Sequence, residues 1–519
     1  MSLPNPESVK EGPVAVPPKQ RLIVVSNRLP YVLERQEGDE WTLQPGSGGL
    51  VTALLPVLRD RGGIWIGWPG TIENPPELKE IFRKASRRAG YLLEPVPLTS
   101  EEVDAYYYGY SNETIWPLFH DLQSQAVFNP QYWQAYEHVN RKFAETLLSV
   151  CRTDDFVWIH DYQLIDVALH LQKSICPANL AFFLHIPFPN PDIYMKLPER
   201  QILLNSLLSY DLVGFQTQRD RRNFIQCVRT LVKNARVRVE GNLHVIRTED
   251  RELRVGSFPI GIDSVAMAAR AGAQEVQDRL HAVRRRFEDR QIVLGLDRLD
   301  YTKGIPHRLR AFADLLERYP EVRGKIHLFQ VVVPSRMGIR EYDELKQEIE
   351  RLVGEINGRY SEVGWVPVHY FFRSVGQTEL LAFYRAASIA LVTPLKDGMN
   401  LVAKEFVACA LEEDSVLILS QFAGAAAQLG RAALVINPYD IEQTADAIYT
   451  AFRMSPGERR YRMRRLRRNV RDQNVFWWVD SFMRAAIDKE LRDFPVMEEY
   501  IPEHHGAPQR PHVSETHSL

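Results

Sequence analysis

Two basic side chains lie close together in the segment 297–304, whose sequence is DRLDYTKG. Arg298 and Lys303 follow QIVLGL, an apolar run that predicts a buried strand. A guanidinium offers a bidentate fork to phosphate oxygens and an ammonium offers a mobile point charge, so this pair suits a diphosphate. Asp297 and Asp300 could instead take up both positive charges in surface ion pairs, and the segment alone leaves the two interpretations open.

A second segment of this kind, 396–401 (KDGMNL), follows the apolar run IALVTPL. Backbone amides of a glycine turn that opens a helix can hold a diphosphate or sugar hydroxyls, and Glu405 on that helix could accept from a ribose diol. A buried glutamate without a partner is costly, and a ligand would supply the partner. Lys404 beside it also permits an ordinary surface helix.

Polar side chains follow two strands predicted in the N-terminal half. Asp161 comes directly after FVWIH, and His185 comes after LAFFL. A carboxylate there can accept two sugar hydroxyls, and a histidine can donate to another; equally, Asp161 could cap the next helix and His185 could be a satisfied interior imidazole. The glycine-rich segment 46–50 (GSGGL) enters a predicted helix, where it could cradle a phosphate or form a tight turn.

Several catalytic signatures are missing from the sequence. It contains no HExxH, no GxSxG, no GxxxxGK[ST] and no Asp-x-Asp pair after a strand to hold a nucleotide-bound divalent metal. We therefore expect a nucleotide-sugar site held by basic side chains, with no metal and no cofactor.

The elements that must position these residues alternate along the chain. Short apolar runs such as RLIVVSN, GIWIGW, DLVGFQT, KIHLFQVVV, VHYFF, SVLILS and AALVINP are separated by longer helical patterns. Continuous apolar strands between helices indicate parallel sheets that are covered on both faces. The sequence therefore predicts an α/β protein, and ligands should bind beyond the carboxyl ends of the strands.

The strands fall into two groups that are separated near SFPIGID (257–263). We expect two doubly wound, Rossmann-like domains, 21–258 and 259–473, which face each other across a cleft. A helix at about 474–490 is expected to pack back on the first domain. Residues 1–20 and 499–519 are polar and rich in proline or histidine, which predicts mobile tails.

Charge and composition limit the functions of the 519-residue chain. It has 64 Lys and Arg against 66 Asp and Glu, a net charge of −2, and so no global field for nucleic acid or an anionic membrane. The arginine run at 459–471 is expected to be a solvated helix face. Four widely spaced cysteines, the lack of a signal-peptide pattern and the lack of an apolar stretch of about 18 residues favour the cytoplasm.

These residues, in this order, resemble the trehalose-6-phosphate synthases, which are retaining glycosyltransferases of the two-domain GT-B type. The resemblance runs from about residue 21 to about residue 490. The motifs that carry it include SNRLP, GSGGL, GIWIGWPG, YYYGYSN, IWPLFH, WIHDYQL, FFLHIPFP, PIGID, DRLDYTKG, LVTPLKDGMNLVAKEF and INPYD.

The resemblance implies transfer of glucose from UDP-glucose to glucose 6-phosphate, which gives α,α-trehalose 6-phosphate and UDP with retention. On the donor side, Arg298 and Lys303 match the residues that grip the diphosphate, Glu405 the one that binds ribose, and His185 the donor-sugar histidine. The donor glucose and diphosphate would also contact Asp397, Gly398, Met399, Asn400 and Leu401, and Gly49 falls on a family donor position. The acceptor would be surrounded by Arg28, Trp68, Tyr107, Trp116, Asp161 and Arg336.

Two alternatives stay open at this level. A sister enzyme that accepts glycerol 3-phosphate, a glucosylglycerol-phosphate synthase, would use the same phosphate anchors. A catalytically silent sugar-phosphate sensor would keep binding and lose chemistry. The base of the donor nucleotide, uracil, adenine or guanine, also stays open, and a homo-oligomer is compatible with the sequence.

Overall fold

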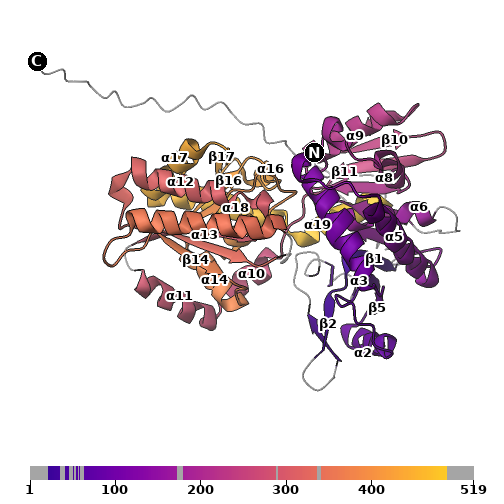
Figure 1. Ribbon diagram of the computed structural model, residues 1–519, viewed down its shortest axis with the longest axis horizontal. Helices are drawn as coiled ribbons and strands as arrows, with labels where there is room; N and C mark the ends of the chain where they lie inside the picture. Colours follow the sequence, from indigo (N-terminus) through magenta and orange to yellow (C-terminus); the bar gives the residue numbers. More distant parts are fainter. Residues whose placement is uncertain are drawn as a thin grey trace, which may run out of the picture. The chain divides into compact units, whose positions relative to one another are not determined.

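The computed structural model describes residues 21–35, 41–45, 51, 54–55, 58, 63–171, 179–287, 290–335 and 340–487. Within these ranges the chain forms two compact units (Figure 1). The N-terminal unit comprises described residues in the ranges 21–216, 220–263 and 473–487, and the C-terminal unit comprises those in 217–219 and 264–472.

A twisted sheet forms the centre of the N-terminal unit. Its described strands follow the order β5-β4-β1-β6-β7-β8-β11-β10-β9. Neighbours from β5 to β11 are parallel, whereas β10 pairs antiparallel with both β11 and β9. Strand order reverses between β1 and β6, and such a switch point opens a crevice at the carboxyl ends of the two strands.

The elements of this unit have the following bounds. The strands are β1 (Leu22–Arg28), β2 (Tyr31–Arg35), β3 (Trp41–Pro45), β4 (Ile64–Trp68), β5 (Leu92–Pro95), β6 (Phe156–His160), β7 (Asn179–Phe183), β8 (Leu212–Phe215), β9 (Arg236–Glu240), β10 (Leu243–Arg247) and β11 (Glu252–Ser257). The helices are α2 (Leu78–Ala89), α3 (Ser100–Glu102), α4 (Trp116–Phe119), α5 (Pro130–Val150), α6 (Val167–Leu171), α7 (Pro191–Tyr194), α8 (Arg200–Leu207), α9 (Gln218–Leu231) and α19 (Val475–Ile487), with a π-helical segment, η1 (Val103–Ile115), between α3 and α4.

Helix α19, near the end of the described chain, packs on the N-terminal unit. The ring of Phe482 stacks on that of Trp158 in β6, with centroids 4.2 Å apart. Arg254 in β11 donates to the carbonyl oxygens of Ala485 and Ala486. The last turn of α19 is thus capped by a guanidinium, which complements the negative end of the helix dipole.

The C-terminal unit is built on a second sheet, whose described strands follow the order β14-β13-β12-β15-β16-β17 and pair in parallel. Its strands are β12 (Gln291–Arg298), β13 (Ile326–Val333), β14 (Val368–Phe372), β15 (Ile389–Val392), β16 (Val416–Ser420) and β17 (Leu434–Ile436). Its helices are α10 (Ser264–Ala271), α11 (Gln274–Arg286), α12 (Ile305–Arg318), α13 (Arg340–Tyr360), α14 (Gln377–Ala386), α15 (Leu401–Cys409), α16 (Ala426–Leu429), α17 (Ile441–Arg453) and α18 (Pro456–Asp472).

Helices cover both faces of this second sheet. On one face, apolar side chains of α12, α13 and α17 pack against β12, β13, β15 and β16 in one buried cluster. In Figure 1, α12 and α17 lie at the top of this unit, and α11 and α14 lie at the bottom. Order reverses between β12 and β15, so a second switch point lies at the ends of those strands. The α/β class with two Rossmann-like sheets is therefore confirmed.

The arginine run expected to be solvated is only partly so. Arg459 in α18 is 9% exposed, and its guanidinium donates to the carbonyl oxygens of Ala451, Phe452 and Met454. Arg467 likewise donates to carbonyl oxygens that end α15. These two side chains close the ends of neighbouring helices, which the charge pattern alone did not indicate.

Candidate active site

The turn after β12 positions the two predicted diphosphate ligands. Asp300 Oδ1 accepts from the amide of Thr302 at 2.9 Å and from its hydroxyl at 2.8 Å, which fixes the 3₁₀ turn that carries Lys303. Gly304 follows with φ of 64°, and a Cβ there would lie 2.2 Å from the carbonyl oxygen of Thr393. Only glycine allows this turn to approach the end of β15 so closely.

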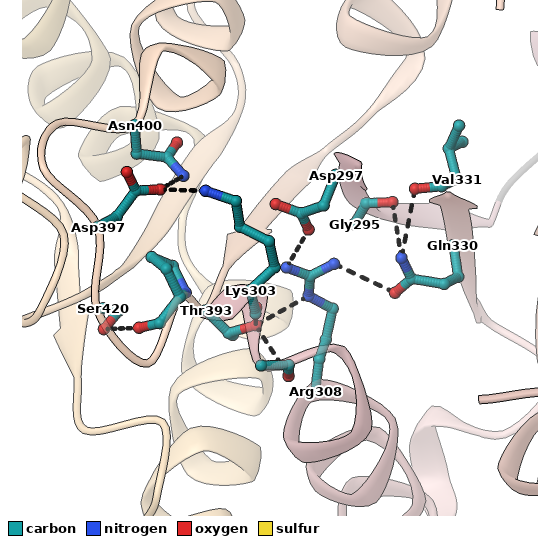
Figure 2. Close-up of polar contacts among 12 residues, drawn as sticks. Gly295, Asp297, Lys303, Arg308, Gln330, Val331, Thr393, Asp397, Asn400 and Ser420 are labelled. Carbon is teal, nitrogen blue, oxygen red and sulfur yellow. Dashed lines mark hydrogen bonds and ion pairs between the residues drawn. The ribbon is translucent and has the colours of Figure 1, made fainter. Parts of the chain in front are cut away.

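Lys303 is bound to Asp397, another of the predicted donor ligands (Figure 2). Its Nζ lies 2.6 Å from Asp397 Oδ2, and the same oxygen accepts from Asn400 Nδ2 at 3.2 Å. Burial lowers the pKa of Lys303, but the carboxylates of Asp397 and Asp300 outweigh burial and raise it above its ordinary value. Lys303 is therefore a charged ammonium at neutral pH, and it is held by the carboxylate of Asp397.

Arg298 behaves differently from Lys303. It is the last residue of β12, its side chain is exposed, and it makes no hydrogen bond or ion pair with any residue that the structure describes. Asp297 does not bind it, because Asp297 Oδ2 is paired with the buried guanidinium of Arg308 at 2.7 Å. The alternative in which Asp297 and Asp300 consume both charges is therefore wrong for this segment.

Arg308 links β12, β13 and the residue that follows β15 beneath this turn (Figure 2). Its side chain is fully buried, and its guanidinium donates to Oδ2 of Asp297, to Oε1 of Gln330 at 3.2 Å and to Oγ1 of Thr393 at 3.1 Å. Burial raises the pKa of Asp297 despite the opposing charges of Arg308 and Lys303. The network holds the turn that carries Arg298 in a fixed place relative to β13 and β15.

The predicted turn 397–401 opens helix α15. Asn400, with φ of 80°, caps the helix by accepting from the amide of Ala403 at 3.1 Å. A Cβ at Gly424 would lie 1.9 Å from the carbonyl oxygen of Gly398, so the neighbouring loop presses directly on the turn. The first amides of a helix have no intrahelical acceptor, and the amides of Asn400 and Leu401 at this helix start make no hydrogen bond with the residues that the structure describes.

Glu405 lies one turn farther along α15. It accepts from the hydroxyl of Tyr384 at 2.8 Å, and burial raises its pKa even though this bond opposes the shift. Lys404 is 1% exposed and donates to Gln428 at 2.6 Å, and burial lowers its pKa to about 7. The surface-helix interpretation is therefore wrong, because Lys404 points into the protein.

In the N-terminal unit, an aromatic cluster surrounds Arg28 at the end of β1. Its guanidinium carbon lies 4.7 Å from the centroid of the Trp68 ring and 5.7 Å from that of Tyr107. Trp68 is 4% exposed and donates to the carbonyl oxygen of Thr71 at 2.9 Å, so its ring is fixed. Arg28 is an exposed cation on a rigid aromatic surface.

The π-helical segment η1 brings the remaining acceptor candidates together. Asn112, which is 3% exposed, donates to the carbonyl oxygen of Tyr107 at 2.7 Å and accepts from the hydroxyl of Tyr162 at 2.9 Å. The ring of Trp116 packs on that of Tyr162, with centroids 5.6 Å apart. Tyr162 directly follows Asp161, so one chain of contacts joins Tyr107, Trp116 and Asp161. Asn112 and Tyr162 lie within the family motifs YYYGYSN and WIHDYQL, but local spacing did not mark them as site residues, because neither follows a strand directly.

Asp161 and His185 are brought together at the carboxyl ends of β6 and β7. Asp161, with φ of 74°, accepts from the amides of Tyr162 at 3.0 Å and His185 at 3.2 Å. It therefore caps a short turn and also ties two strand ends together. Burial lowers the pKa of His185 to about 3, so its imidazole is neutral at physiological pH.

The predicted residues thus fall into two clusters, one in each unit, and each is described by itself. Gly49 and Arg336 lie outside the described residues. Among the residues that the structure describes, no three His, Cys, Asp or Glu side chains gather as a metal would require, and no helix is long and apolar enough to cross a membrane.

Two Rossmann-like units, one of them carrying paired cations and a helix N-terminus at its switch point, define the GT-B type of glycosyltransferase. Residues 20–488 match the model of glycosyltransferase family 20, so the chain belongs to that family.

Named relatives and solved structures agree with this assignment. The chain is 41% identical over 482 residues to a trehalose-6-phosphate synthase of Mycobacterium avium, covering 91% of this chain and 96% of the relative. It is 42% identical over 486 residues to that of Mycolicibacterium smegmatis, covering 92% and 95%. A Burkholderia xenovorans α,α-trehalose-phosphate synthase (UDP-forming) in complex with glucose-6-phosphate is 34% identical, with a TM-score of 0.80 and coverage of 90% and 99%. A structure from E. coli bound with UDP-2-fluoro glucose is equally similar, at 34% identity and a TM-score of 0.80.

Proposed function

We propose that the chain transfers glucose from UDP-glucose to glucose 6-phosphate and forms α,α-trehalose 6-phosphate and UDP with retention. The observation that carries the proposal is the pair Arg298 and Lys303 beside the N-terminus of α15, at the switch point of the C-terminal sheet. Relatives that are 41–42% identical and span nearly the whole chain are trehalose-6-phosphate synthases, which identifies the sugar chemistry that this anion site serves.

On the donor side, the diphosphate takes Lys303 away from Asp397. The ammonium and the guanidinium of Arg298 then face the diphosphate oxygens, and the carboxylate of Asp397, which also accepts from Asn400, accepts from a hydroxyl of the donor glucose. Amides of Gly398, Met399, Asn400 and Leu401 add neutral donors, and Glu405 accepts from the ribose. The pair of Lys303 with Asp397 is itself charge-assisted, so the exchange is favoured by the second cation, Arg298, and by the higher negative charge of the diphosphate.

On the acceptor side, Arg28 binds the phosphate of glucose 6-phosphate, and we expect Arg336 to join it. Trp68, Tyr107 and Trp116 form the apolar wall of this site, while Asp161 accepts from acceptor hydroxyls; we expect Gly49 to contact the donor. An arginine that is held over a fixed indole has little conformational freedom left to lose on binding, which favours recognition of a phosphate.

The transfer needs no nucleophile from the protein. The bond between C1 of glucose and the diphosphate oxygen breaks as the acceptor hydroxyl approaches C1 from the same face. The hydroxyl proton passes to the departing phosphate oxygen, so glucose keeps its configuration and UDP leaves. Arg298 and Lys303 stabilise the negative charge that develops on UDP, which is where preorganised donors lower a barrier most.

We also propose that the enzyme works in the cytoplasm. The described cysteines Cys151, Cys227 and Cys409 are free thiols, and burial raises the pKa of Cys227 and Cys409 to about 12. Such thiols are unreactive packing groups, which suits a reducing compartment.

A donor-by-acceptor activity matrix tests the proposal. Purified chain is incubated with UDP-, ADP- or GDP-glucose and with glucose 6-phosphate or glycerol 3-phosphate, and products are identified by NMR. We expect UDP-glucose and glucose 6-phosphate to give UDP and α,α-trehalose 6-phosphate, both with and without EDTA to remove divalent metal. Preference for glycerol 3-phosphate would replace the proposed acceptor, and tight substrate binding by calorimetry without any product would indicate a sensor.

A further inference from the structure

The imidazole of His185 is held from two sides by neutral side chains of the N-terminal unit. Its Nδ1 lies 3.3 Å from Nε2 of Gln216, the residue after strand β8. Its Nε2 lies 3.2 Å from Nδ1 of His160, the last residue of β6. Both ring nitrogens are therefore engaged inside the protein, and the direction of each bond decides what the ring can offer to a ligand.

A backbone amide fixes the orientation of Gln216. The amide of Ile260 donates to Oε1 of Gln216 at 2.9 Å, so the atom in that place must be the oxygen. The other end of the side chain is then the NH₂ group, which can only donate. It follows that Nδ1 of His185 accepts this bond and carries no proton.

The proton of His185 must lie on Nε2. Burial lowers the pKa of His185 to about 3, and burial together with His185 lowers the pKa of His160 well below its ordinary value, so each ring carries one proton at neutral pH. With Nδ1 accepting, Nε2–H of His185 donates to Nδ1 of His160. His160 then carries its own proton on Nε2, which is buried and has no partner among the residues that the structure describes.

We infer that Gln216 is a positioning residue that fixes His185 in the neutral Nε2–H tautomer. The inference rests on the proposed function, in which His185 contacts the donor glucose. In this tautomer the ring has no proton to give to the sugar, because Nε2–H is bound to His160. The single lone pair of Nδ1 is likewise taken by Gln216, so His185 contacts the donor glucose as a neutral ring and is neither a general acid nor a general base.

Replacement of Gln216 by Glu should reverse the donor and acceptor in each hydrogen bond from residue 216 through His185 to His160. One carboxylate oxygen keeps the bond from Ile260, and the other accepts where the NH₂ group donated, so Nδ1 of His185 becomes protonated. Nε2 of His185 then accepts from Nδ1–H of His160. This reversal also removes the proton from the buried Nε2 of His160, so the variant is expected to fold.

Tautomers are read from long-range ¹H–¹⁵N correlations of the full chain labelled with ¹⁵N-histidine, without substrates. Signals of His185 are assigned by their loss in His185→Gln. We expect Nε2 protonated and Nδ1 bare in the unmodified chain, and the opposite in Gln216→Glu. Gln134→Glu, an exposed position on α5 with the same charge change, should leave the pattern unchanged.

Synthase kinetics supply a second readout. Gln216→Glu should lower kcat at least about ten-fold and leave KM for glucose 6-phosphate within about two-fold, because the ring that contacts the donor glucose then has its two nitrogens exchanged in role and a carboxylate beside it. A proton on Nδ1 in the unmodified chain, or a tautomer that Gln216→Glu and the uncharged Gln216→Met both leave unchanged, would overturn the inference. The expected tautomers in a chain that makes no trehalose 6-phosphate would instead overturn the proposed function and leave the role of Gln216 intact.

Discussion

The two units hold their candidate side chains by different means. In the C-terminal unit, charges are paired in advance: Lys303 with Asp397, and Arg308 with Asp297. In the N-terminal unit, Arg28 has no carboxylate partner among the described residues and rests on aromatic rings, while Asp161 and His185 are joined through a backbone amide. The C-terminal unit therefore holds its charged side chains in internal ion pairs, whereas the N-terminal unit exposes the Arg28 guanidinium on an uncharged aromatic surface.

The difference matches the two tasks. A leaving diphosphate gains charge during the reaction, so its ligands must be fixed before the reaction begins. The phosphate of an acceptor keeps its charge throughout, and in the function that we propose the exposed guanidinium over Trp68 binds it. We therefore expect the C-terminal pairs to contribute to stability and turnover, and the N-terminal cation to contribute to affinity.

The largest effect is expected when the buried pair beneath the donor site is broken. Arg308→Met leaves Asp297 charged and buried, so the free energy of unfolding should fall by about 3–5 kcal/mol in equilibrium urea unfolding. Arg340→Met removes an exposed partner of Glu344 and should change stability by at most about 0.5 kcal/mol. Asp297→Leu combined with Arg308→Met should recover most of the loss, and a double variant no better than the single one would contradict the assignment.

Arg298→Ala tests the claim about turnover. The side chain has no partner among the described residues, so stability should stay within about 0.5 kcal/mol, whereas kcat should fall by about 10²-fold or more when a charge-stabilising donor is lost. Steady-state kinetics and thermal unfolding separate the two effects. Near-normal turnover would remove Arg298 from the donor site.

Arg28→Met tests the claim about affinity. Methionine keeps an apolar stem over Trp68 but has no charge for the phosphate, so KM for glucose 6-phosphate should rise about ten-fold or more while KM for UDP-glucose stays unchanged. Arg35→Met, which removes a half-exposed partner of Glu73, is the matched control. Equal changes in both KM values would show that Arg28 does not distinguish the acceptor.

The smallest effect concerns pH and the neutral histidines of the N-terminal unit. The folded pKa of His185 is about 3, below the 6.5 of an unfolded histidine. Above pH 6.5 both states are neutral, and as pH falls from 6.5 toward 3 only the unfolded chain binds the proton, so stability is lost. His185→Gln should reduce this loss by at most about 1.4 kcal/mol per pH unit, measured by urea unfolding at pH 7, 6 and 5. An unchanged slope would show that His185 is not held neutral.

Much of the fold could be predicted because its strands are buried on both faces. Runs such as QIVLGL and FVWIH coincide with β12 and β6, and their continuous apolar character indicated parallel sheets. The antiparallel strand β9 escaped notice because its side chains are mostly exposed. The π-helical segment η1 also gave no signal, since its widened turn has no distinct apolar period.

The site could be predicted only in part, and for a physical reason. Residues that directly follow a strand can be picked out along the sequence, and so Arg298 and Asp161 were candidates. The pairing of Lys303 with Asp397 joins positions 94 residues apart, and the proton chain through Gln216 depends on a backbone amide at Ile260. Such three-dimensional contacts leave no trace in local spacing.

The contact of Gly424 with Gly398 has a practical consequence for redesign. Because a methyl group at position 424 would collide with a carbonyl oxygen of the turn, this glycine constrains the shape of the backbone that we propose contacts the donor. Mutant libraries that aim at a different nucleotide sugar should hold it constant. A deliberate alanine there would be a way to loosen the turn without touching any side chain that contacts substrate.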